Sequence, residues 1–144
     1  MAHAEATVTI NQPVEEVFDF LADGTTNKQW RSGVLDIAKA SGDGAGAIYR
    51  QTMKGPGGRK IQGDYRVTRL ERPTRLAFEV IAGPARPTGS YELRAESPTS
   101  TSVTFTLDLE PRGLAKIMGP MINRQMQKEV ASITELKRVL EQSA

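Results

Sequence analysis

The C-terminal part of the chain, Arg112 to Gln142, carries the pattern that most restricts the fold. Apolar side chains recur there at steps of three and four residues, as at Met126, Val130 and Ile133. This spacing predicts one amphipathic helix with a single apolar stripe. A helix of about 28 residues would be on the order of 40 Å long, close to the width of a small domain. Because burying such a stripe stabilises a helix far more than its intrinsic propensity does, the rest of the chain must cover it.

A kink is expected in this helix near Gly119-Pro120. Proline has no N–H, and its ring collides with the carbonyl group four residues earlier in a regular helix. The methionines around this point, Met118, Met121 and Met126, would give an adaptable apolar lining. Ordinary core packing explains these methionines equally well, so a ligand-facing wall and a plain core both stay open.

The rest of the chain reads as one strand, two short helices and six further strands. The segment Glu5–Ile10 alternates apolar and polar residues, as a strand does, and Pro13 suits the first turn of a short helix that follows. A second short helix is expected from Asn27 to Trp30. The further strands are expected near Val34–Ala40, Ala47–Lys54, Arg59–Leu70, Arg75–Ala82, Thr88–Glu96 and Thr101–Glu110. Short turns between them predict antiparallel neighbours.

Composition excludes several classes of function. The 144 residues suit one domain, 1–144, and no long apolar run or signal peptide is present, so we expect a cytoplasmic protein without an integral membrane segment. There is no cysteine, and the single histidine, His3, lies near the terminus. No metal site, cofactor or Ser-His-Asp arrangement is therefore expected. A net charge of +2 with scattered basic residues argues against nucleic acid as a partner. We expect a monomer or a weak homodimer.

The order of elements predicts an α+β fold, in which helices gather on one face of an antiparallel sheet. Together with the segments Ile10–Trp30, Tyr65–Val80 and Val103–Met121, this order resembles the SRPBCC superfamily. That superfamily includes START-like, polyketide cyclase/dehydrase-like and birch-pollen-allergen-like helix-grip proteins, and the resemblance covers essentially the whole chain. It implies a curved seven-stranded sheet wrapped around the C-terminal helix, with a cavity between them that holds a small apolar molecule.

Candidate ligand-binding residues are the aromatic side chains expected to point inward from the sheet, together with the helix face beyond the predicted kink. They are Trp30, Tyr49, Tyr65, Phe78, Tyr91, Phe105, Met118, Met121, Ile122 and Gln125. Within the helix, Met121, Ile122 and Gln125 are expected to form the cavity wall. The later stripe residues Val130, Ile133 and Leu140 are expected to be structural core. Each aromatic residue taken singly is also explained by core packing.

Two classes of function stay open, and a third class is ranked below them. The favoured class is a binder or carrier of a small hydrophobic molecule, with lipids and aromatic or polyketide-like compounds as candidates. The runner-up is a polyketide cyclase/aromatase-like enzyme that acts in the same cavity, and the third is a protein-interaction module.

No catalytic residue can be assigned from the sequence. The charged residues considered for acid–base or oxyanion roles, if their strands or helix turn them inward, are Asp64, Glu79, Glu129, Arg50 and Arg66. A buried arginine or carboxylate with a strongly shifted pKa would favour the enzyme. A lining limited to tyrosines, methionines and Gln125 would favour the binder.

Overall fold

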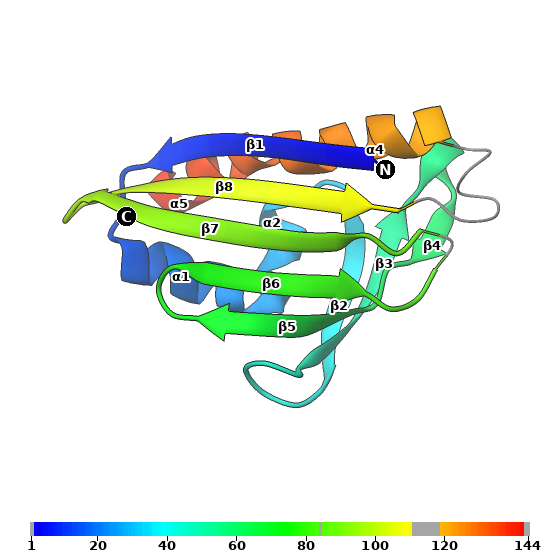
Figure 1. The fold of residues 1–144 in the computed structure, drawn as a ribbon, viewed down its shortest axis with the longest axis horizontal. Helices are drawn as coiled ribbons and strands as arrows, with labels where there is room; N and C mark the ends of the chain where they lie inside the picture. Colours follow the sequence, from blue (N-terminus) through cyan, green and yellow to red (C-terminus); the bar gives the residue numbers. More distant parts are fainter. Residues whose placement is uncertain (1, 84, 111–118, 143–144) are drawn as a thin grey trace.

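One antiparallel sheet with helices on its concave side forms the fold (Figure 1). The computed structural model describes residues 2–83, 85–110 and 119–142. The strands are β1 (Ala2–Ile10), β2 (Val34–Ser41), β3 (Ile48–Lys54), β4 (Lys60–Gln62), β5 (Tyr65–Glu71), β6 (Arg75–Val80), β7 (Thr88–Ser97) and β8 (Ser100–Leu109). The helices are α1 (Val14–Ala22), α2 (Asn27–Trp30), α4 (Gly119–Ala131) and α5 (Ile133–Gln142), with 3₁₀ turns η1 (Gly24–Thr26) and η2 (Pro56–Gly58).

The strand order is β1-β8-β7-β6-β5-β3-β2, and β4 pairs with β3 outside this path. Every pair of neighbours is antiparallel. The alternation predicted for the last strand is complete in β8, where Val103, Phe105, Leu107 and Leu109 are buried and the residues between them are partly exposed. The α+β fold and the antiparallel sheet are therefore confirmed.

The predicted strand Arg59–Leu70 is two strands, so the sheet has eight strands instead of seven. Gly63 and Asp64 interrupt it, and both bind Gln51 on β3: Gly63 N–H donates to the Gln51 carbonyl oxygen over 2.8 Å, and Asp64 Oδ1 accepts the Gln51 N–H over 3.0 Å. Before this break β4 pairs with the end of β3, whereas after it β5 pairs with the beginning of β3. The interruption lets β3 exchange one neighbour for another.

The sheet curls where β3 meets β5. These two strands share only the residue pairs Ile48 with Arg66 and Tyr49 with Tyr65, whereas β7 and β8 pair along almost their whole length. In Figure 1, β2 and β3 run steeply across the direction of β5 to β8. Such a bend makes a concave face, and α4 and α5 lie along that side next to β1.

The predicted C-terminal helix is divided at Ser132 into α4 and α5. The Ser132 hydroxyl donates to the Glu129 carbonyl oxygen over 2.5 Å, a local bond that competes with the helical hydrogen-bond pattern. Pro120 lies in the first turn of α4 as described. The expected kink involves the preceding residues 111–118, which lie outside the described residues.

The second half of the predicted helix packs as core, as expected. Val130, Ile133 and Leu140 are buried. The end of α5 is also tied to the N-terminal region by polar contacts, since Glu141 Oε2 accepts the Asn11 N–H over 2.9 Å and Gln12 Nε2 donates to the Leu140 carbonyl oxygen over 3.2 Å. The C-terminal end of α5 is therefore anchored to the N-terminal region of the chain.

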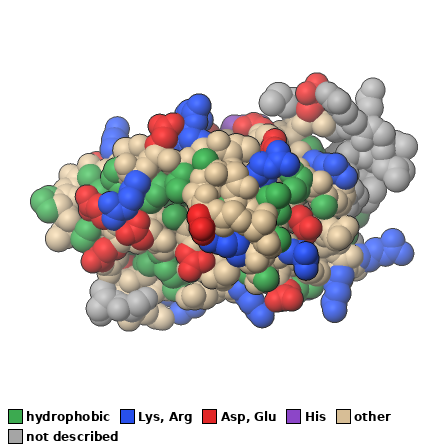
Figure 2. Space-filling model, turned by 90° about the horizontal axis from the view of Figure 1, so that it is seen from below, with side chains coloured by type: hydrophobic (Ala, Val, Ile, Leu, Met, Phe, Trp, Pro, Cys, Tyr) green, Lys and Arg blue, Asp and Glu red, His purple; other side chains and the backbone are tan. Residues whose placement is uncertain are grey.

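The surface carries charges of both signs. Figure 2 shows basic and acidic side chains interspersed over the face that it presents. No helix in the described part of the chain is long and apolar enough to cross a membrane.

Candidate functional site

A cavity of about 180 Å³ lies between α4 and the concave face of the sheet, and we call it the inner cavity. Its lining comes from β3, β4, β6, β8, the segment before β7, the residue after α2, and α4. The residues are Arg31, Gln51, Met53, Lys54, Ile61, Gln62, Gly63, Phe78, Val80, Ala85, Pro87, Leu107, Leu109, Ile122, Gln125, Met126 and Glu129. Most of these side chains are apolar, so the inner cavity suits a hydrophobic molecule.

An ion pair forms the polar part of the inner cavity. Arg31 Nε and Nη2 both donate to Glu129 Oε2, over 3.1 and 2.6 Å. The two side chains are only 6% and 8% exposed. Gly33 makes room for the carboxylate, because a Cβ atom there would lie 2.3 Å from Glu129 Oε1. A side chain at position 33 would therefore displace the pair.

Aromatic rings surround the Arg31 guanidinium group. Its Cζ lies 5.5 Å from the centre of the Phe105 ring and 6.0 Å from that of Trp30. Burial works against the charged form, but the attraction and hydrogen bonds of Glu129, together with the neighbouring Tyr91 and Tyr65, outweigh it and raise the pKa of Arg31 above its ordinary value. Burial also raises the pKa of Tyr91 to about 12, against the opposing effect of the Arg31 charge. The lining of the cavity thus includes a permanent, paired cation, and the protonated phenol of Tyr91 lies in the core beside it.

Gln51 supplies a second polar group. Its side chain is 3% exposed, and its Nε2 donates to the Gly63 carbonyl oxygen over 3.2 Å. Among the described residues, nothing donates a hydrogen bond to Oε1. Gln51, a lining residue of the inner cavity, therefore carries a buried acceptor that has almost no accessible surface and no partner among the described residues.

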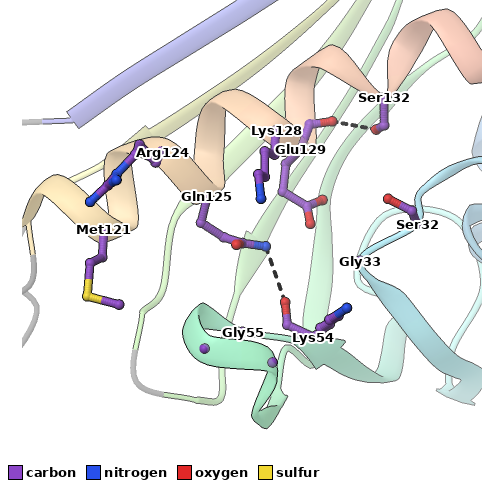
Figure 3. Close-up of a pocket in the computed structure, with 12 residues that line it drawn as sticks. Ser32, Gly33, Lys54, Gly55, Met121, Arg124, Gln125, Lys128, Glu129 and Ser132 are labelled. Atoms are coloured by element: carbon purple, nitrogen blue, oxygen red, sulfur yellow. Dashed lines mark hydrogen bonds between the residues drawn. The ribbon is translucent and has the colours of Figure 1, made fainter.

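A larger groove of about 460 Å³ lies outside the inner cavity, and we call it the outer groove. It is bounded by α4, by the η2 turn between β3 and β4, and by the Ser32-Gly33 segment (Figure 3). Lys54, Gln125 and Glu129 line both spaces. Gln125 Nε2 donates to the Lys54 carbonyl oxygen over 3.2 Å, and Figure 3 shows this bond joining α4 to the hairpin below it. The bond lies at the boundary between the two spaces.

The outer groove is basic. Lys54, Arg124 and Lys128 line it, and all three side chains are exposed. Within the described ranges no ion pair involves them. Glu129, the acidic residue of this groove, is held by Arg31. The outer groove is therefore lined by exposed charged side chains, whereas the inner cavity is mainly apolar.

The six predicted aromatic residues form one row of touching rings through the core. The order of contact is Tyr49, Tyr65, Phe78, Tyr91, Phe105 and Trp30, with ring centres 4.6 to 6.1 Å apart. Phe78 alone of the six lines the inner cavity. The Tyr65 hydroxyl accepts a hydrogen bond from Asn27 Nδ2 over 3.2 Å. The row therefore packs mostly as core beside the cavity.

The helical candidates divide between the two spaces. Ile122 and Gln125 line the inner cavity, while Met121 is 41% exposed and lines only the outer groove. Met118 lies outside the described residues. Whether any of the ten candidate residues contacts a ligand stays a prediction.

The charged residues considered from the sequence lie in different places, and not all of them are at the inner cavity. Glu129 is buried at the inner cavity, whereas Asp64 binds the Gln51 N–H and Glu79 pairs with Arg66 at the surface. Arg50 is exposed.

Two buried polar residues of the inner cavity, Arg31 and Gln51, were not among the candidates. Arg31 follows the last residue of α2 and has no place in an apolar pattern. Gln51 did carry a signal, because it lies two residues from Tyr49 and so shares the inward face of β3. For Glu129 the signal was its spacing of three from Met126 and four from Ile133, which puts a carboxylate in the buried stripe.

Solved structures share this fold. The protein TTHA0849 from Thermus thermophilus is 22% identical, with a TM-score of 0.81 and 99% of each chain covered. A START superfamily protein from Mycobacterium smegmatis is 16% identical, with a TM-score of 0.82 and 100% of each chain covered. The Zhui aromatase/cyclase from Streptomyces sp. R1128 is 16% identical, with a TM-score of 0.71, and 95% of this chain and 94% of that chain are covered. At these identities the likeness shows the fold, which is the helix-grip fold.

No curated protein matches the sequence closely enough to serve as a relative. The sequence profile of one family does match, over residues 1–141, and that family is described as polyketide cyclase / dehydrase and lipid transport. The resemblance to the SRPBCC superfamily is thereby confirmed, and the chain belongs to the polyketide cyclase / dehydrase and lipid transport family.

Proposed function

We propose that this protein binds a small, mainly hydrophobic molecule in the inner cavity, with the polar group of that molecule next to Arg31, Glu129 and Gln51. One observation carries the proposal. The walls of the cavity are mostly apolar, and the buried polar residues among them are the paired Arg31 and Glu129 and Gln51. Binding sites for small molecules have this composition, with mainly apolar walls and a few polar groups that orient the ligand.

Binding can be tested with an apolar fluorescent probe and a pair of matched variants. Ile122→Trp places a large ring in the inner cavity and should abolish probe uptake. Gln127→Trp adds the same ring to an exposed position of α4 that lines neither space, so probe uptake should be unchanged. Equal uptake by Ile122→Trp and the wild type would place the probe elsewhere and refute the proposal.

The natural ligand requires a separate experiment. Native mass spectrometry of protein purified from its own host, followed by extraction of the bound material, should detect a small molecule that travels with the chain. The Ile122→Trp variant purified in the same way should carry none. This comparison separates a cavity ligand from material bound to the surface.

A cyclase-like enzyme is the second candidate, favoured by the buried Arg31 of the cavity lining and by Tyr91, a core residue in contact with the lining residue Phe78. A phenol whose pKa is raised to about 12 stays protonated at neutral pH and can donate to a substrate carbonyl. In the reaction a methylene carbon of a poly-β-ketone would lose a proton and bond to one of the molecule's own carbonyl carbons, whose oxygen would take up a proton. The resulting hydroxyl group would then leave as water with a hydrogen from the neighbouring carbon. We expect no cyclised product above the uncatalysed rate in mass-spectrometric assays with poly-β-ketone mimics. A product that forms much faster, and that Tyr91→Phe loses, would establish the enzyme instead.

A further inference from the structure

The outer groove adds a charged element to the site, and the inference drawn from it rests on the proposed function above. We infer that the ligand is an amphiphile with an acidic group. Its apolar body fills the inner cavity, and its carboxylate, phosphate or sulfate group lies in the outer groove among Lys54, Arg124 and Lys128. Two observations carry this inference, the unbalanced charge of the groove and the lining that it shares with the cavity.

The positive charge of the groove is not balanced by any described side chain. Lys54, Arg124 and Lys128 line the groove, and within the described ranges none of them forms an ion pair. The carboxylate of the groove, Glu129, accepts two hydrogen bonds from Arg31, and its side chain is only 8% exposed. An anion in the groove therefore meets three cations without a counter-charge and a carboxylate that is already neutralised, so it is attracted.

The basic side chains on the convex face of the sheet are arranged differently. Three arginines there each have an acidic neighbour: Arg66 with Glu79, Arg75 with Glu92 and Arg94 with Glu96. The hairpin of β3, η2 and β4, which bounds the groove, instead adds two more exposed cations, Arg59 and Lys60, also without an ion pair among the described residues. Unbalanced positive charge is therefore gathered around the outer groove.

The two spaces share part of their lining, so one molecule can occupy both. Lys54, Gln125 and Glu129 line each of them. A ligand that fills the inner cavity therefore already borders one of the cations, Lys54. The bond from Gln125 to the Lys54 carbonyl oxygen lies at the boundary, and Gln125 is only half-buried. In Figure 3, Lys128 extends from α4 toward the hairpin that carries Lys54. An acidic group attached to an apolar body at this boundary lies between cations of both elements.

A membrane surface is another anion that a basic region attracts. The shape of the site favours a small ligand instead. The cations line a hollow of about 460 Å³ between α4 and the η2 turn, and this hollow adjoins an apolar cavity. A single acidic group can enter such a hollow, whereas a flat membrane cannot.

The test uses two fluorescent probes that differ by one sulfonate group, N-phenyl-1-naphthylamine and 8-anilino-1-naphthalenesulfonate. Fluorescence titration gives the dissociation constants of both for the wild type, for Arg124→Gln/Lys128→Gln, and for the control Lys28→Gln/Arg50→Gln. The control removes two exposed cations that line neither space. The preference for the sulfonate probe over the neutral probe should fall about tenfold in the groove variant, because two attractive charges are lost, and less than about twofold in the control.

Salt and the cavity variant complete the test. The wild-type preference should weaken as salt is added, because ions screen exposed charges. Ile122→Trp should lose both probes, since the apolar body of each needs the inner cavity. Sulfonate binding that persists in Ile122→Trp overturns the inference, because the groove then binds the anion alone.

A preference that is unchanged in the groove variant, or that falls equally in the control, also overturns the inference. If the groove variant keeps the probe preference but loses wild-type binding to phosphatidylserine vesicles, the cations serve a membrane surface and the inference is wrong. If neither probe binds the wild type, the proposed function fails and the inference falls with it. Binding of both probes with an unaltered preference refutes the inference alone.

Discussion

The buried ion pair between Arg31 and Glu129 gives a quantitative test of the site. Replacing Glu129 by leucine leaves the guanidinium group in a place where its side chain is 6% exposed, without a counter-charge. Replacing Arg31 by methionine leaves the carboxylate in the same situation. Breaking one partner of a buried pair typically costs about 3–5 kcal/mol of unfolding free energy. We therefore expect each single variant to be destabilised by that amount.

The double variant Arg31→Met/Glu129→Leu should behave differently. It removes both charges and keeps apolar side chains of roughly similar size, so its stability should lie near that of the wild type. Simple addition of the two single effects would predict a loss of roughly 6–10 kcal/mol, which is as large as the whole stability of many domains. The difference between these results is the coupling energy of the pair.

Urea unfolding at 25 °C measures this cycle, followed by circular dichroism and by the fluorescence of Trp30. Trp30 is the single tryptophan and lies 6.0 Å from the guanidinium group, so it reports on the site itself. The surface pair Arg66 and Glu79, with side chains 46% and 39% exposed, serves as the control cycle and should show a coupling below about 1 kcal/mol. Single variants at Arg31 and Glu129 that each cost under about 1 kcal/mol, or a double variant that costs their sum, would refute the reasoning.

Three further predictions concern packing and pH. Ile133→Ala should cost about 2–5 kcal/mol in urea unfolding, because the side chain is fully buried in α5, and should leave probe affinity intact because it does not line the inner cavity. Gly89→Ala should cost about 1–3 kcal/mol and weaken probe binding, since the new Cβ would lie 2.2 Å from the Phe78 ring, which lines the inner cavity. The hydrogen bond from Lys137 lowers the pKa of Glu141 below its ordinary 4.5, so the stability that this carboxylate adds is present above pH 4.5 and is lost as the pH falls through the lowered value. The stability difference between the wild type and Glu141→Gln, measured by urea unfolding across this range, should therefore shrink toward acid.

The regular parts of the fold were predictable because burial imposes a period on the sequence. In β8 the buried side chains alternate, from Val103 to Leu109, and in α5 they recur at Ile133, Leu136 and Leu140. Both patterns follow from one buried face, and the neighbouring elements do not need to be known. The inward parity of the tyrosines on β3, β5 and β7 follows from the same rule.

The break between β4 and β5 was not predictable in this way. Gly63 and Asp64 stand inside a segment that otherwise reads as one strand, and their effect depends on Gln51, a residue of the neighbouring strand. The apolar pattern of a strand depends on the sequence of that strand alone, whereas this interruption depends on contacts between the β4–β5 segment and the neighbouring strand β3. Ser132 presents the same difficulty in the helix, since serine is compatible with a helix until its hydroxyl group binds the carbonyl group of Glu129.

The polar part of the inner cavity is built at these irregular positions. Arg31 lies just past the end of α2, Gln51 is held by the break between β4 and β5, and Glu129 lies in the last turn of α4, over a glycine. A regular element presents a side chain of fixed direction at every turn or pleat, whereas its end allows a long polar side chain to reach inward while its backbone remains satisfied. Arg31 is therefore found where a periodic pattern stops, whereas Gln51 and Glu129 occupy inward positions of a strand and a helix, and a search for apolar periodicity identifies the walls of this cavity before its polar groups.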